Sequence, residues 1–372
     1  MTEGTQSLTL GTFPYYPNNP WQDLIYSDLR RTGARVVPIA DLEDLSWLDA
    51  AQRRGDALAL HVNWTAPVSQ VGSIAEASDR VGRVVSTLDA LSRAGVAVIW
   101  TVHNVLPHDA EHLVPELALC RELADKSDLI TVPNPATPTA VRPWYSLPQE
   151  KVVELPQPSY IGLYPDEVSR AGARERLGLD PSERVLLLFG TLRPYKGIEE
   201  AVAAMPDLRT HLPGTRLLIA GEIGPGYDRA ALERITAGVD GVDLHAGYIG
   251  ASEVQHWMRA ADAMLLPYRA GLNSGVLLLA AGFGLPVIMS ESDMSLGYAD
   301  SPWVHVIRRG QLLSEGVRDG LRRFSEFDPR PAALKAAQAN EPTRISRLFT
   351  SQVRTAMART TGRSDRTPPL AS

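Results

Sequence analysis

The sequence predicts an α/β protein that consists of two doubly wound, parallel-sheet domains facing a cleft. Its 372 residues are enough for two or three domains of roughly 150 residues each. Short apolar, β-branched runs alternate along the chain with longer amphipathic runs, a pattern that is typical of βαβ units and parallel sheets. A segment punctuated with prolines, between Val152 and Asp180, separates two such series.

The amino-terminal half begins with a strand and then alternates helices and strands. The expected strands are Leu8–Phe13, Arg35–Ile39, Ala57–Val62, Val96–His103 and Leu129–Val132. The expected helices are Trp21–Thr32, Leu45–Arg53, Ile74–Arg93 and Ala110–Ala124. Asn18 and Asn19 precede Pro20, which gives the first of these helices a capping residue and a proline in its first turn.

The carboxyl-terminal half repeats the alternation after a short charged helix expected over Val168–Leu177. Its expected strands are Arg184–Phe189, Arg216–Ala220, Val242–His245, Ala263–Leu266, Pro286–Met289 and Val304–Arg308. Its expected helices are Ile198–Leu212, Asp228–Ala237, Ser252–Ala261 and Ser274–Phe283, and after Arg330 only helix is expected. We therefore expect one domain over residues 1–165, a second over residues 166–340, a helix over residues 341–360, and a disordered tail over residues 361–372.

Composition narrows the class of protein. Hydrophobic residues make up 44% and charged residues 22% of the chain, which is typical of a soluble globular protein. The net charge of −6 gives no support to nucleic-acid binding. Cys120 is the single cysteine, so an internal disulfide is excluded. The first ten residues lack the pattern of a secretory signal, and the longest apolar stretch is too short to cross a bilayer, so we expect a cytoplasmic protein.

The turn over residues 189–197, FGTLRPYKG, follows an expected strand and opens an expected helix. Gly190 lets the backbone approach a ligand, and the amino terminus of the helix presents N–H groups to an anion. Arg193 can hold phosphate oxygens through two hydrogen bonds, and Lys196 adds a compact positive charge. A tight turn with two solvated cations is the alternative, but the pattern favours a phosphate site.

This G-x-x-R-x-x-K-G turn resembles that of nucleotide-sugar glycosyltransferases of the GT-B fold, which has two Rossmann-like domains. The resemblance is to the bacterial group that builds exopolysaccharides and lipid-linked glycans. It continues through LLIAGE at residues 217–222, AGYI at 246–249, AADAMLLP at 260–267 and GFGLPV at 282–287. It implies that Arg193 and Lys196 hold the donor diphosphate, and that Glu222, Tyr248 and Ile249 lie near the nucleotide base. It also implies that the last helix crosses back to the first domain.

One departure concerns acidic residues. Retaining members of this group carry two glutamates, eight positions apart, after the stretch that matches AADAMLLP, whereas no acidic residue occurs here between Asp262 and Glu291. What remains is Asn273-Ser274-Gly275 at the start of an expected helix. These three residues fit either a phosphate site or a plain helix cap, because both use the same N–H groups.

Two histidines and an aspartate, His103, His108 and Asp109, cluster at the carboxyl end of the expected strand Val96–His103. A histidine in this place can act as a general base or as a hydrogen-bonding partner of a sugar. A structural histidine is the alternative for His103, and the resemblance places a donor-sugar contact at His103 rather than at His108. Asp109 is a second candidate for catalysis, or merely the cap of the helix that follows.

The expected acceptor site lies on loops of the first domain. Tyr15 and Asn18 follow the first strand, and Asn63 follows the third. Their aromatic and amide groups can bind a sugar by stacking and by hydrogen bonds, although a rigid proline-rich turn explains the first loop equally well. The resemblance adds a peripheral membrane contact, for which Arg30, Arg31 and Arg35 beside Leu24 and Ile25 are candidates, and a solvated helix face is the alternative.

Several motifs are absent from the sequence. There is no Gly-Lys-Ser/Thr P-loop, no G-x-S-x-G elbow and no G-x-G-x-x-G after the first strand, which argues against a kinase, a hydrolase and a dehydrogenase. We therefore expect a glycosyltransferase that uses a nucleoside-diphosphate sugar, with GDP-mannose as the guess, and a glycan or lipid-linked acceptor. It needs neither a metal nor another cofactor. The alternatives are a nucleotide-sugar epimerase and a catalytically inert glycosyltransferase-like partner subunit.

Overall fold

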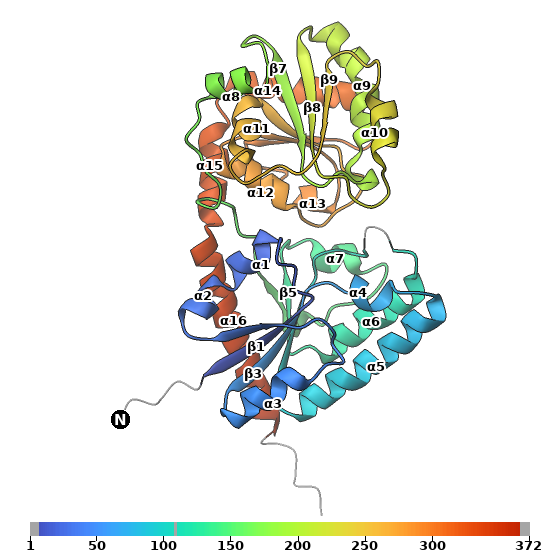
Figure 1. The fold of residues 1–372 in the computed structure, drawn as a ribbon, viewed down its shortest axis with the longest axis vertical. Helices are drawn as coiled ribbons and strands as arrows, with labels where there is room; N and C mark the ends of the chain where they lie inside the picture. Colours follow the sequence, from blue (N-terminus) through green and yellow to red (C-terminus); the bar gives the residue numbers. More distant parts are fainter. Residues whose placement is uncertain (1–6, 108–109, 365–372) are drawn as a thin grey trace, which may run out of the picture. The chain divides into compact units, whose positions relative to one another are not determined.

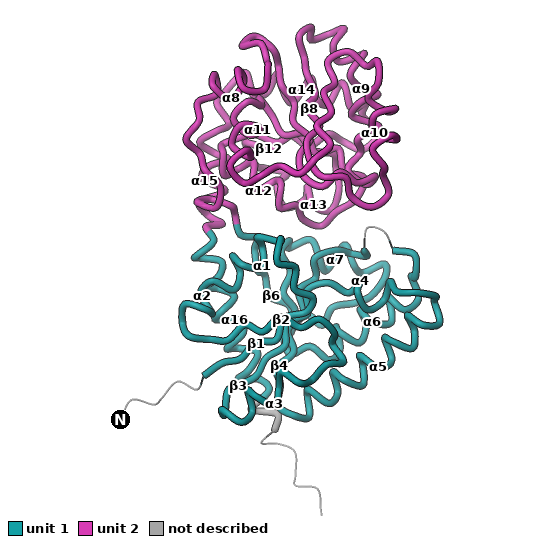
Figure 2. Tube along the Cα trace, in the orientation of Figure 1, with its two compact units in different colours: residues 1–158, 342–372 teal, residues 159–341 magenta. Residues whose placement is uncertain are grey.

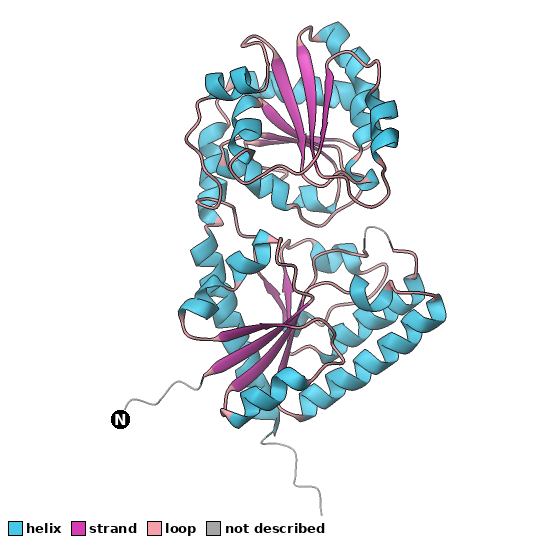
Figure 3. Ribbon diagram, viewed as in Figure 1, coloured by secondary structure: helices cyan, strands magenta, loops and turns pink. Residues whose placement is uncertain are grey.

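The computed structural model describes residues 7–107 and 110–364, and the chain divides into two compact units (Figure 2). Unit 1 comprises Met1–Pro158 and Pro342–Ser372, and unit 2 comprises Ser159–Glu341. The sequence analysis places the corresponding domain limits at residues 165 and 340. Both units carry helices on the two faces of a parallel sheet (Figures 1 and 3), so the predicted fold class is confirmed.

The sheet of unit 1 has six parallel strands in the order β2-β1-β3-β4-β5-β6. These strands are β1 (Leu8–Phe13), β2 (Arg35–Pro38), β3 (Ala57–Val62), β4 (Ala97–Thr101), β5 (Leu129–Val132) and β6 (Val152–Glu154). In the register of β1 and β3, Phe13 lies opposite Val62. The loops after β1 and β3 therefore leave the same edge of the sheet, which places the segment after Phe13 beside Asn63.

Helices cover both faces of this sheet. One layer consists of α1 (Pro20–Ile25), α2 (Ser27–Arg31) and α16 (Pro342–Ser364). The other contains α3 (Ser46–Arg53), α4 (Ala66–Ser69), α5 (Ile74–Arg93) and α6 (Leu113–Lys126). The short helix α7 (Thr137–Val141) and the 3-10 turn η1 (Gln149–Lys151) connect β5 to β6. Because both faces are covered, strands such as β4 read as continuous apolar runs.

Unit 2 repeats this architecture, with six parallel strands in the order β12-β11-β10-β7-β8-β9. The strands are β7 (Arg184–Phe189), β8 (Thr215–Gly221), β9 (Val242–Ala246), β10 (Ala263–Leu266), β11 (Val287–Ser290) and β12 (Val304–Ile307). One face packs against α8 (Arg170–Arg176), α11 (Val254–Ala260), α12 (Gly275–Gly282) and α15 (Arg330–Ala339). The other packs against α9 (Ile198–His211), α10 (Arg229–Thr236) and α14 (Leu313–Glu326). The turn η2 (Pro194–Lys196) precedes α9, and α13 (Asp293–Leu296) follows β11.

The predicted strands agree with the structure to within two residues at each end, but the helices differ in several places. The helix expected over Trp21–Thr32 is interrupted at Tyr26, which ends α1 and begins α2. Asn19 caps α1, since its side chain accepts a hydrogen bond from the backbone N–H of Trp21. The segments that the sequence analysis missed are α4, α7, α13, α14 and β6.

The last helix, α16, completes the hydrophobic core on one face of unit 1. Ile345, Phe349 and Val353 are buried there, and the Phe349 ring lies 4.8 Å from the ring of His61. Leu348, on the same helix, is 39% exposed and lies outside this buried apolar stripe. The stripe therefore consists of residues spaced by four, which face the sheet.

Phe349→Ala is expected to lower the free energy of unfolding of unit 1 by about 3 to 5 kcal/mol, because it removes a fully buried aromatic side chain. Leu348→Ala, on the same helix, is the matched control and is expected to change stability by less than about 1 kcal/mol. Chemical denaturation followed by circular dichroism measures both. Equal losses in the two variants would show that α16 does not contribute to the core through this face.

Candidate functional site

The loop from β7 to α9 is shaped by close backbone packing. Gly190 has a φ of 87° and Gly197 a φ of 70°, the left-handed region that glycine tolerates. A Cβ at Gly197 would lie 2.1 Å from the carbonyl oxygen of Pro267, and one at Gly221 would lie 2.1 Å from that of Gly190. Larger residues at Gly197 and Gly221 would therefore force neighbouring backbone apart. The glycines hold this loop close to the strand ends at β8 and β10.

Lys196 is buried in this loop, with only 4% of its surface exposed. Its Nζ donates a hydrogen bond of 3.1 Å to the carbonyl oxygen of Phe189 and lies 5.7 Å from the centre of the Tyr268 ring. Burial, together with the positive charge of Arg193, lowers the pKa of Lys196 to about 7. Lys196 is therefore not a solvated cation, because η2 turns its side chain inward beneath the loop.

The start of α12 lies against the same loop. A Cβ on Gly190 would be 3.3 Å from both the Nζ of Lys196 and the Cγ2 of Val276. Ser274 is the N-cap residue of α12, yet its side chain makes no capping hydrogen bond. The structure thus brings Gly190, Lys196 and the Asn273-Ser274-Gly275 segment together. A helix amino terminus next to an ammonium group is an environment that favours an anion.

Arg193 and Glu222 lie beside this cluster on neighbouring loops. The backbone N–H of Leu192 donates a 2.7 Å hydrogen bond to the carbonyl oxygen of Glu222. A Cβ at Gly224 would lie 2.9 Å from the Cγ of Arg193, so the Arg193 side chain passes along this loop. The Glu222 side chain is exposed. The backbone of Glu222 is therefore close to the cluster, and its carboxylate extends into solvent.

Tyr248 and Ile249 lie elsewhere on unit 2. They follow β9, the edge strand, and line a groove with residues of α8 and α11. Tyr248 is 78% exposed. Among the residues that line this groove there is neither a member of the β7–α9 loop nor one of the α12 start. Tyr248 and Ile249 therefore line a groove that is separate from the loop that contains Lys196.

Carboxylates near the loop come from α9, which sequence reasoning missed. Arg269 pairs with Glu200 at 2.6 Å and with Glu199 at 3.5 Å. The hydroxyl group of Tyr227 donates a 2.5 Å hydrogen bond to Glu199. The signal in the sequence is the pair of glutamates directly after the G-x-x-R-x-x-K-G turn, at the first turn of α9. The stretch 263–290 itself contains no acidic residue.

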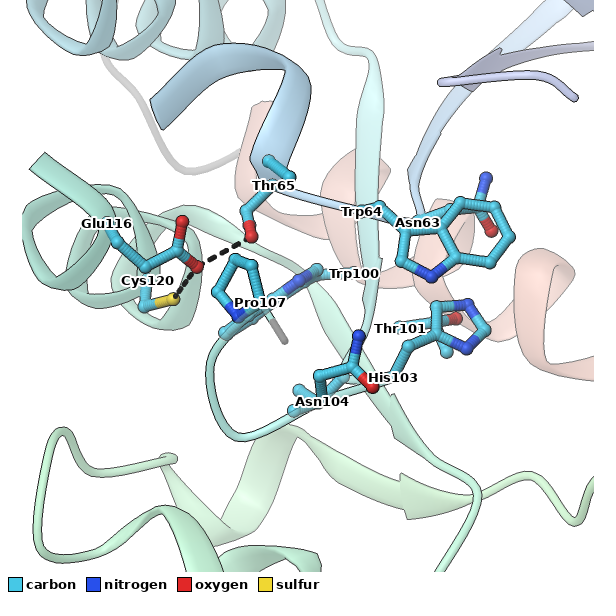
Figure 4. A pocket seen from close by; sticks show the side chains of 12 residues that line it. Asn63, Trp64, Thr65, Trp100, Thr101, His103, Asn104, Pro107, Glu116 and Cys120 are labelled. Atoms are coloured by element: carbon cyan, nitrogen blue, oxygen red, sulfur yellow. Dashed lines mark hydrogen bonds between the residues drawn. The ribbon is translucent and has the colours of Figure 1, made fainter. Parts of the chain in front are cut away.

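In unit 1, His103 lies in an aromatic enclosure at the end of β4 (Figure 4). Its ring is stacked on Trp64 at 4.5 Å and meets Trp21 edge-on at 4.6 Å. The side chain is 7% exposed, and burial lowers its pKa to about 3. The imidazole is therefore neutral at physiological pH. A group with so low a pKa is a poor general base, but it remains a hydrogen-bonding partner of fixed orientation.

Asn63 belongs to a buried hydrogen-bond network below this enclosure. Its amide donates to Thr12 at 3.1 Å and to the hydroxyl of Tyr26 at 3.2 Å. The network continues from Tyr26 to Nδ1 of His61 at 2.8 Å, and from Nε2 of His61 to Thr101 at 2.7 Å. Asn63 is 1% exposed, so the structure places it under the strand ends and not on their surface.

The remaining predicted residues of unit 1 are Tyr15, Asn18, Arg30, Arg31, His108 and Asp109. The Tyr15 hydroxyl donates a 3.0 Å hydrogen bond to Asp23, and Asn18 is exposed on the same loop. His108 and Asp109 lie outside the described residues, so the assignment of Asp109 to catalysis stays a prediction. Arg30 and Arg31 pair with Asp23 and Asp28 at 2.9 and 2.6 Å.

A pocket of about 340 Å³ adjoins His103, and a carboxylate that sequence reasoning missed lines it (Figure 4). Glu116 is buried and accepts hydrogen bonds from Thr65 at 2.6 Å, from Cys120 at 3.3 Å and from Ser69. Nothing in the local sequence marks Glu116, because it lies within an ordinary amphipathic helix. Only the tertiary packing of α4 against α6 brings these donors around it.

Three comparisons relate this chain to known proteins. Residues 183–300 match the family model described as glycosyl transferases group 1. A D-inositol 3-phosphate glycosyltransferase from Segniliparus rotundus is 27% identical over 217 residues, which are 54% of this chain and 46% of that protein. A GDP-mannose:glycolipid 4-beta-D-mannosyltransferase from Xanthomonas campestris pv. campestris is 26% identical over 299 residues, which are 78% of this chain and 77% of that protein.

The fold has close counterparts among solved structures. A sucrose-phosphate synthase from Thermosynechococcus elongatus matches with a TM-score of 0.71 at 16% identity, over 95% of this chain and 100% of that one. The chain spans about half the length of the inositol-phosphate relative and about three quarters of the Xanthomonas relative. Residues 183–300 therefore correspond to a glycosyl transferases group 1 domain, and the described chain has the two-domain GT-B fold of these structural counterparts.

Proposed function

We propose that the chain transfers a sugar from a nucleoside-diphosphate sugar, and that unit 2 binds the donor diphosphate. The observation that carries this proposal is the position of Lys196, buried beside Gly190 and the start of α12. Its ammonium group loses hydration on burial, so a bound dianion would restore favourable interactions there. Arg193 and the N–H groups of Asn273-Ser274-Gly275 would complete the phosphate contacts.

The donor is GDP-mannose in this proposal, and the acceptor is a lipid-linked glycan. Support comes from the Xanthomonas relative, whose name gives GDP-mannose as its donor and a glycolipid as its acceptor. The same name specifies a beta linkage. Together with the absence of acidic residues between Asp262 and Glu291, this favours an inverting reaction.

The transfer consists of one displacement at the anomeric carbon. An acceptor oxygen attacks this carbon, the bond to the diphosphate breaks, and GDP leaves with the bonding electrons. Arg193 and Lys196 stabilise the negative charge that develops on the leaving group. Asp109 takes the proton of the acceptor hydroxyl in this scheme, since the low pKa of His103 suits it to a neutral hydrogen bond with the donor sugar.

The acceptor would be bound by unit 1. Tyr15 and Asn18 lie on the exposed loop after β1, where they can contact a sugar. Asn63 would act by holding the ends of β1 and β3 through its buried hydrogen bonds. Contact with a membrane surface is part of the proposal, but Arg30 and Arg31 give it little support, because their carboxylate partners already neutralise them and Ile25 is buried.

No described helix combines the length and the apolar character that a membrane-spanning segment requires. The epimerase alternative gains no support from any observation on the site or from the relatives.

GDP-mannose is expected to raise the melting temperature of the protein, whereas an equal concentration of mannose is expected to leave it unchanged. The melting temperature with UDP-glucose is compared with that in GDP-mannose, to test whether the protein distinguishes the two nucleotide sugars. EDTA should alter neither the shift nor the transfer rate, because Arg193 and Lys196 supply the positive charge at the diphosphate. Differential scanning fluorimetry and a radiolabel transfer assay with a lipid-linked acceptor measure these effects. A shift without transfer would indicate an inert partner subunit, and loss of transfer in EDTA would contradict metal independence.

A further inference from the structure

Glu116 is a buried carboxylate on α6 that the proposed reaction leaves unused. It lines the pocket beside His103 and is only 1% exposed. Among the residues that the structure describes, no cation pairs with Glu116, and hydroxyl and thiol groups satisfy its oxygens instead. A carboxylate that is buried without a cation loses hydration, which its hydrogen bonds alone must offset. An apolar side chain would fill this place at a lower cost, so the hydrogen bonds of Glu116 call for a further explanation.

These hydrogen bonds fasten the short helix α4 to α6 (Figure 4). Oε1 of Glu116 accepts from the hydroxyl of Thr65 at 2.6 Å, and Oε2 accepts from the hydroxyl of Ser69. Thr65 and Ser69 lie at the two ends of α4. Thr65 is the N-cap residue, yet its side chain makes no capping hydrogen bond, because its hydroxyl donates to Glu116 instead. A single helical turn is unstable by itself, so α4 depends on this attachment to the longer helix.

Trp64 directly precedes Thr65 and forms one wall of the enclosure around His103. Its ring is stacked on the imidazole, with 4.5 Å between the centres and 16° between the planes, and it also meets Trp21 edge-on at 6.0 Å. On the other side of Trp64, the backbone N–H of Asn63 donates a 2.6 Å hydrogen bond to the carbonyl oxygen of Phe13. The Trp64 backbone is therefore held from two directions, by the end of the sheet and by Glu116.

We propose that Glu116 is a positioning residue for His103, and that it acts through Thr65 and Trp64. The proposal rests on the proposed function in one respect, because that function gives His103 its contact with the donor sugar. Glu116 fixes the start of α4, the start of α4 fixes the plane of the Trp64 ring, and the imidazole lies against that ring. A group that makes a directed hydrogen bond to a substrate has to be held within about 0.5 Å of its productive position.

The first measurement needs no substrate. In protein that contains 13C-labelled histidine, the NMR signals of the His103 ring report the ring currents of Trp64 and Trp21. The signals that are missing from the spectrum of His103→Ala identify them among those of the eight histidines. Glu116→Ala and Thr65→Val are each expected to shift these signals, because either change releases the start of α4.

Two matched variants are expected to leave the His103 signals in place. In Glu116→Gln, the amide oxygen can accept from Thr65 and the amide nitrogen can donate to Ser69, so the attachment of α4 persists. Glu122→Ala removes a carboxylate from the same helix, where Glu122 is 3.6 Å from Lys126 and not bonded to α4. A shift in Glu116→Ala that Glu122→Ala lacks therefore reports the hydrogen bonds of Glu116.

The second measurement uses transfer from GDP-mannose. Glu116→Ala is expected to lower kcat about tenfold, while the donor KM changes less than about twofold. In the His103→Ala background, the same substitution is expected to lower kcat by less than about twofold, because the group that Glu116 positions is gone. A general loss of folded protein would lower the rate equally in both backgrounds, so the comparison separates positioning from stability.

Unshifted His103 signals in both Glu116→Ala and Thr65→Val, or an equal fold loss of kcat with and without His103, would overturn the proposal. So would a Glu116→Gln variant that behaves like Glu116→Ala. If Glu116→Ala does not fold, Thr65→Val serves for both measurements, since valine keeps the shape of threonine. Absence of transfer by the wild type with any nucleotide sugar is a failure of the proposed function instead, and the histidine signals then still test the positioning.

Discussion

Lys196→Met is expected to cost at least about 2 kcal/mol of transition-state stabilisation, roughly thirtyfold in kcat/KM. The charge of Lys196 lies where the diphosphate should acquire its negative charge, and no other lysine is close to this loop in the sequence. Methionine keeps the length and volume of the buried side chain, so the fold should survive. Steady-state kinetics with GDP-mannose and the melting temperature, taken from one preparation, measure the two effects.

Two further variants test whether the loss of rate is specific to the ammonium group of Lys196. Lys335→Met removes an exposed lysine on α15 and should leave kcat/KM unchanged. Lys196→Arg should not restore the rate, because the guanidinium group is larger than the ammonium group and the surrounding loop is tightly packed. Wild-type turnover in Lys196→Met would remove this residue from the diphosphate site.

The pH dependence of donor binding provides a second readout for Lys196. In the free protein its pKa is lowered to about 7, and a bound dianion would raise it, since an opposite charge favours the ammonium form. Below pH 7 the lysine is already protonated, so donor affinity is expected to be flat. As the pH rises above 7, binding must take up a proton, and affinity should fall by up to about tenfold per pH unit. Lys196→Met should abolish this slope.

His103→Ala is expected to lower kcat by about a hundredfold while the affinity for GDP-mannose changes little. The variant removes a hydrogen-bonding group that Trp64 and Trp21 hold in one orientation, whereas the diphosphate contacts of unit 2 remain. With a pKa of about 3, His103 should contribute no inflection to the rate profile between about pH 5 and pH 9. Stopped assays over this range, with calorimetry for donor binding, provide the measurements.

A structural role for His103 predicts a different outcome. His103→Ala would then lower the melting temperature and keep the specific rate per folded molecule. Trp64→Leu is the informative companion, because it removes the stacked ring and leaves the imidazole in place. A rate inflection near pH 6.5 that disappears in His103→Ala would show instead that His103 titrates as an ordinary base.

The sequence predicts the sheets of this protein better than its helices. Each strand with both faces buried is an unbroken apolar run, as in β7, and this signal depends on nearby residues alone. The helix α14 was missed because Gly316 and Gly320 lower its intrinsic helical tendency. The structure explains these glycines, since a Cβ at Gly316 would lie 2.5 Å from Ile307, and one at Gly320 would lie 2.9 Å from Ile288.

The candidate site was predictable to the extent that its residues share one loop. Gly190, Arg193 and Lys196 lie in one turn, so their spacing alone indicates a phosphate site. The burial of Lys196 was not predictable, because it depends on Tyr268 and on the start of α12, more than 70 residues away along the chain. The enclosure of His103 depends in the same way on Trp21 and Trp64, which come from two other segments.

The order in which this chain is synthesised differs from the order in which its units can be completed. Unit 2 is one continuous stretch, Ser159–Glu341, whereas unit 1 lacks α16 until the ribosome has passed residue 341. During translation, the apolar face that Ile345, Phe349 and Val353 later cover therefore has to wait while a whole second unit emerges and folds. Premature termination within unit 2 would leave this face uncovered, so nascent chains of that length would be natural clients of chaperones and proteases.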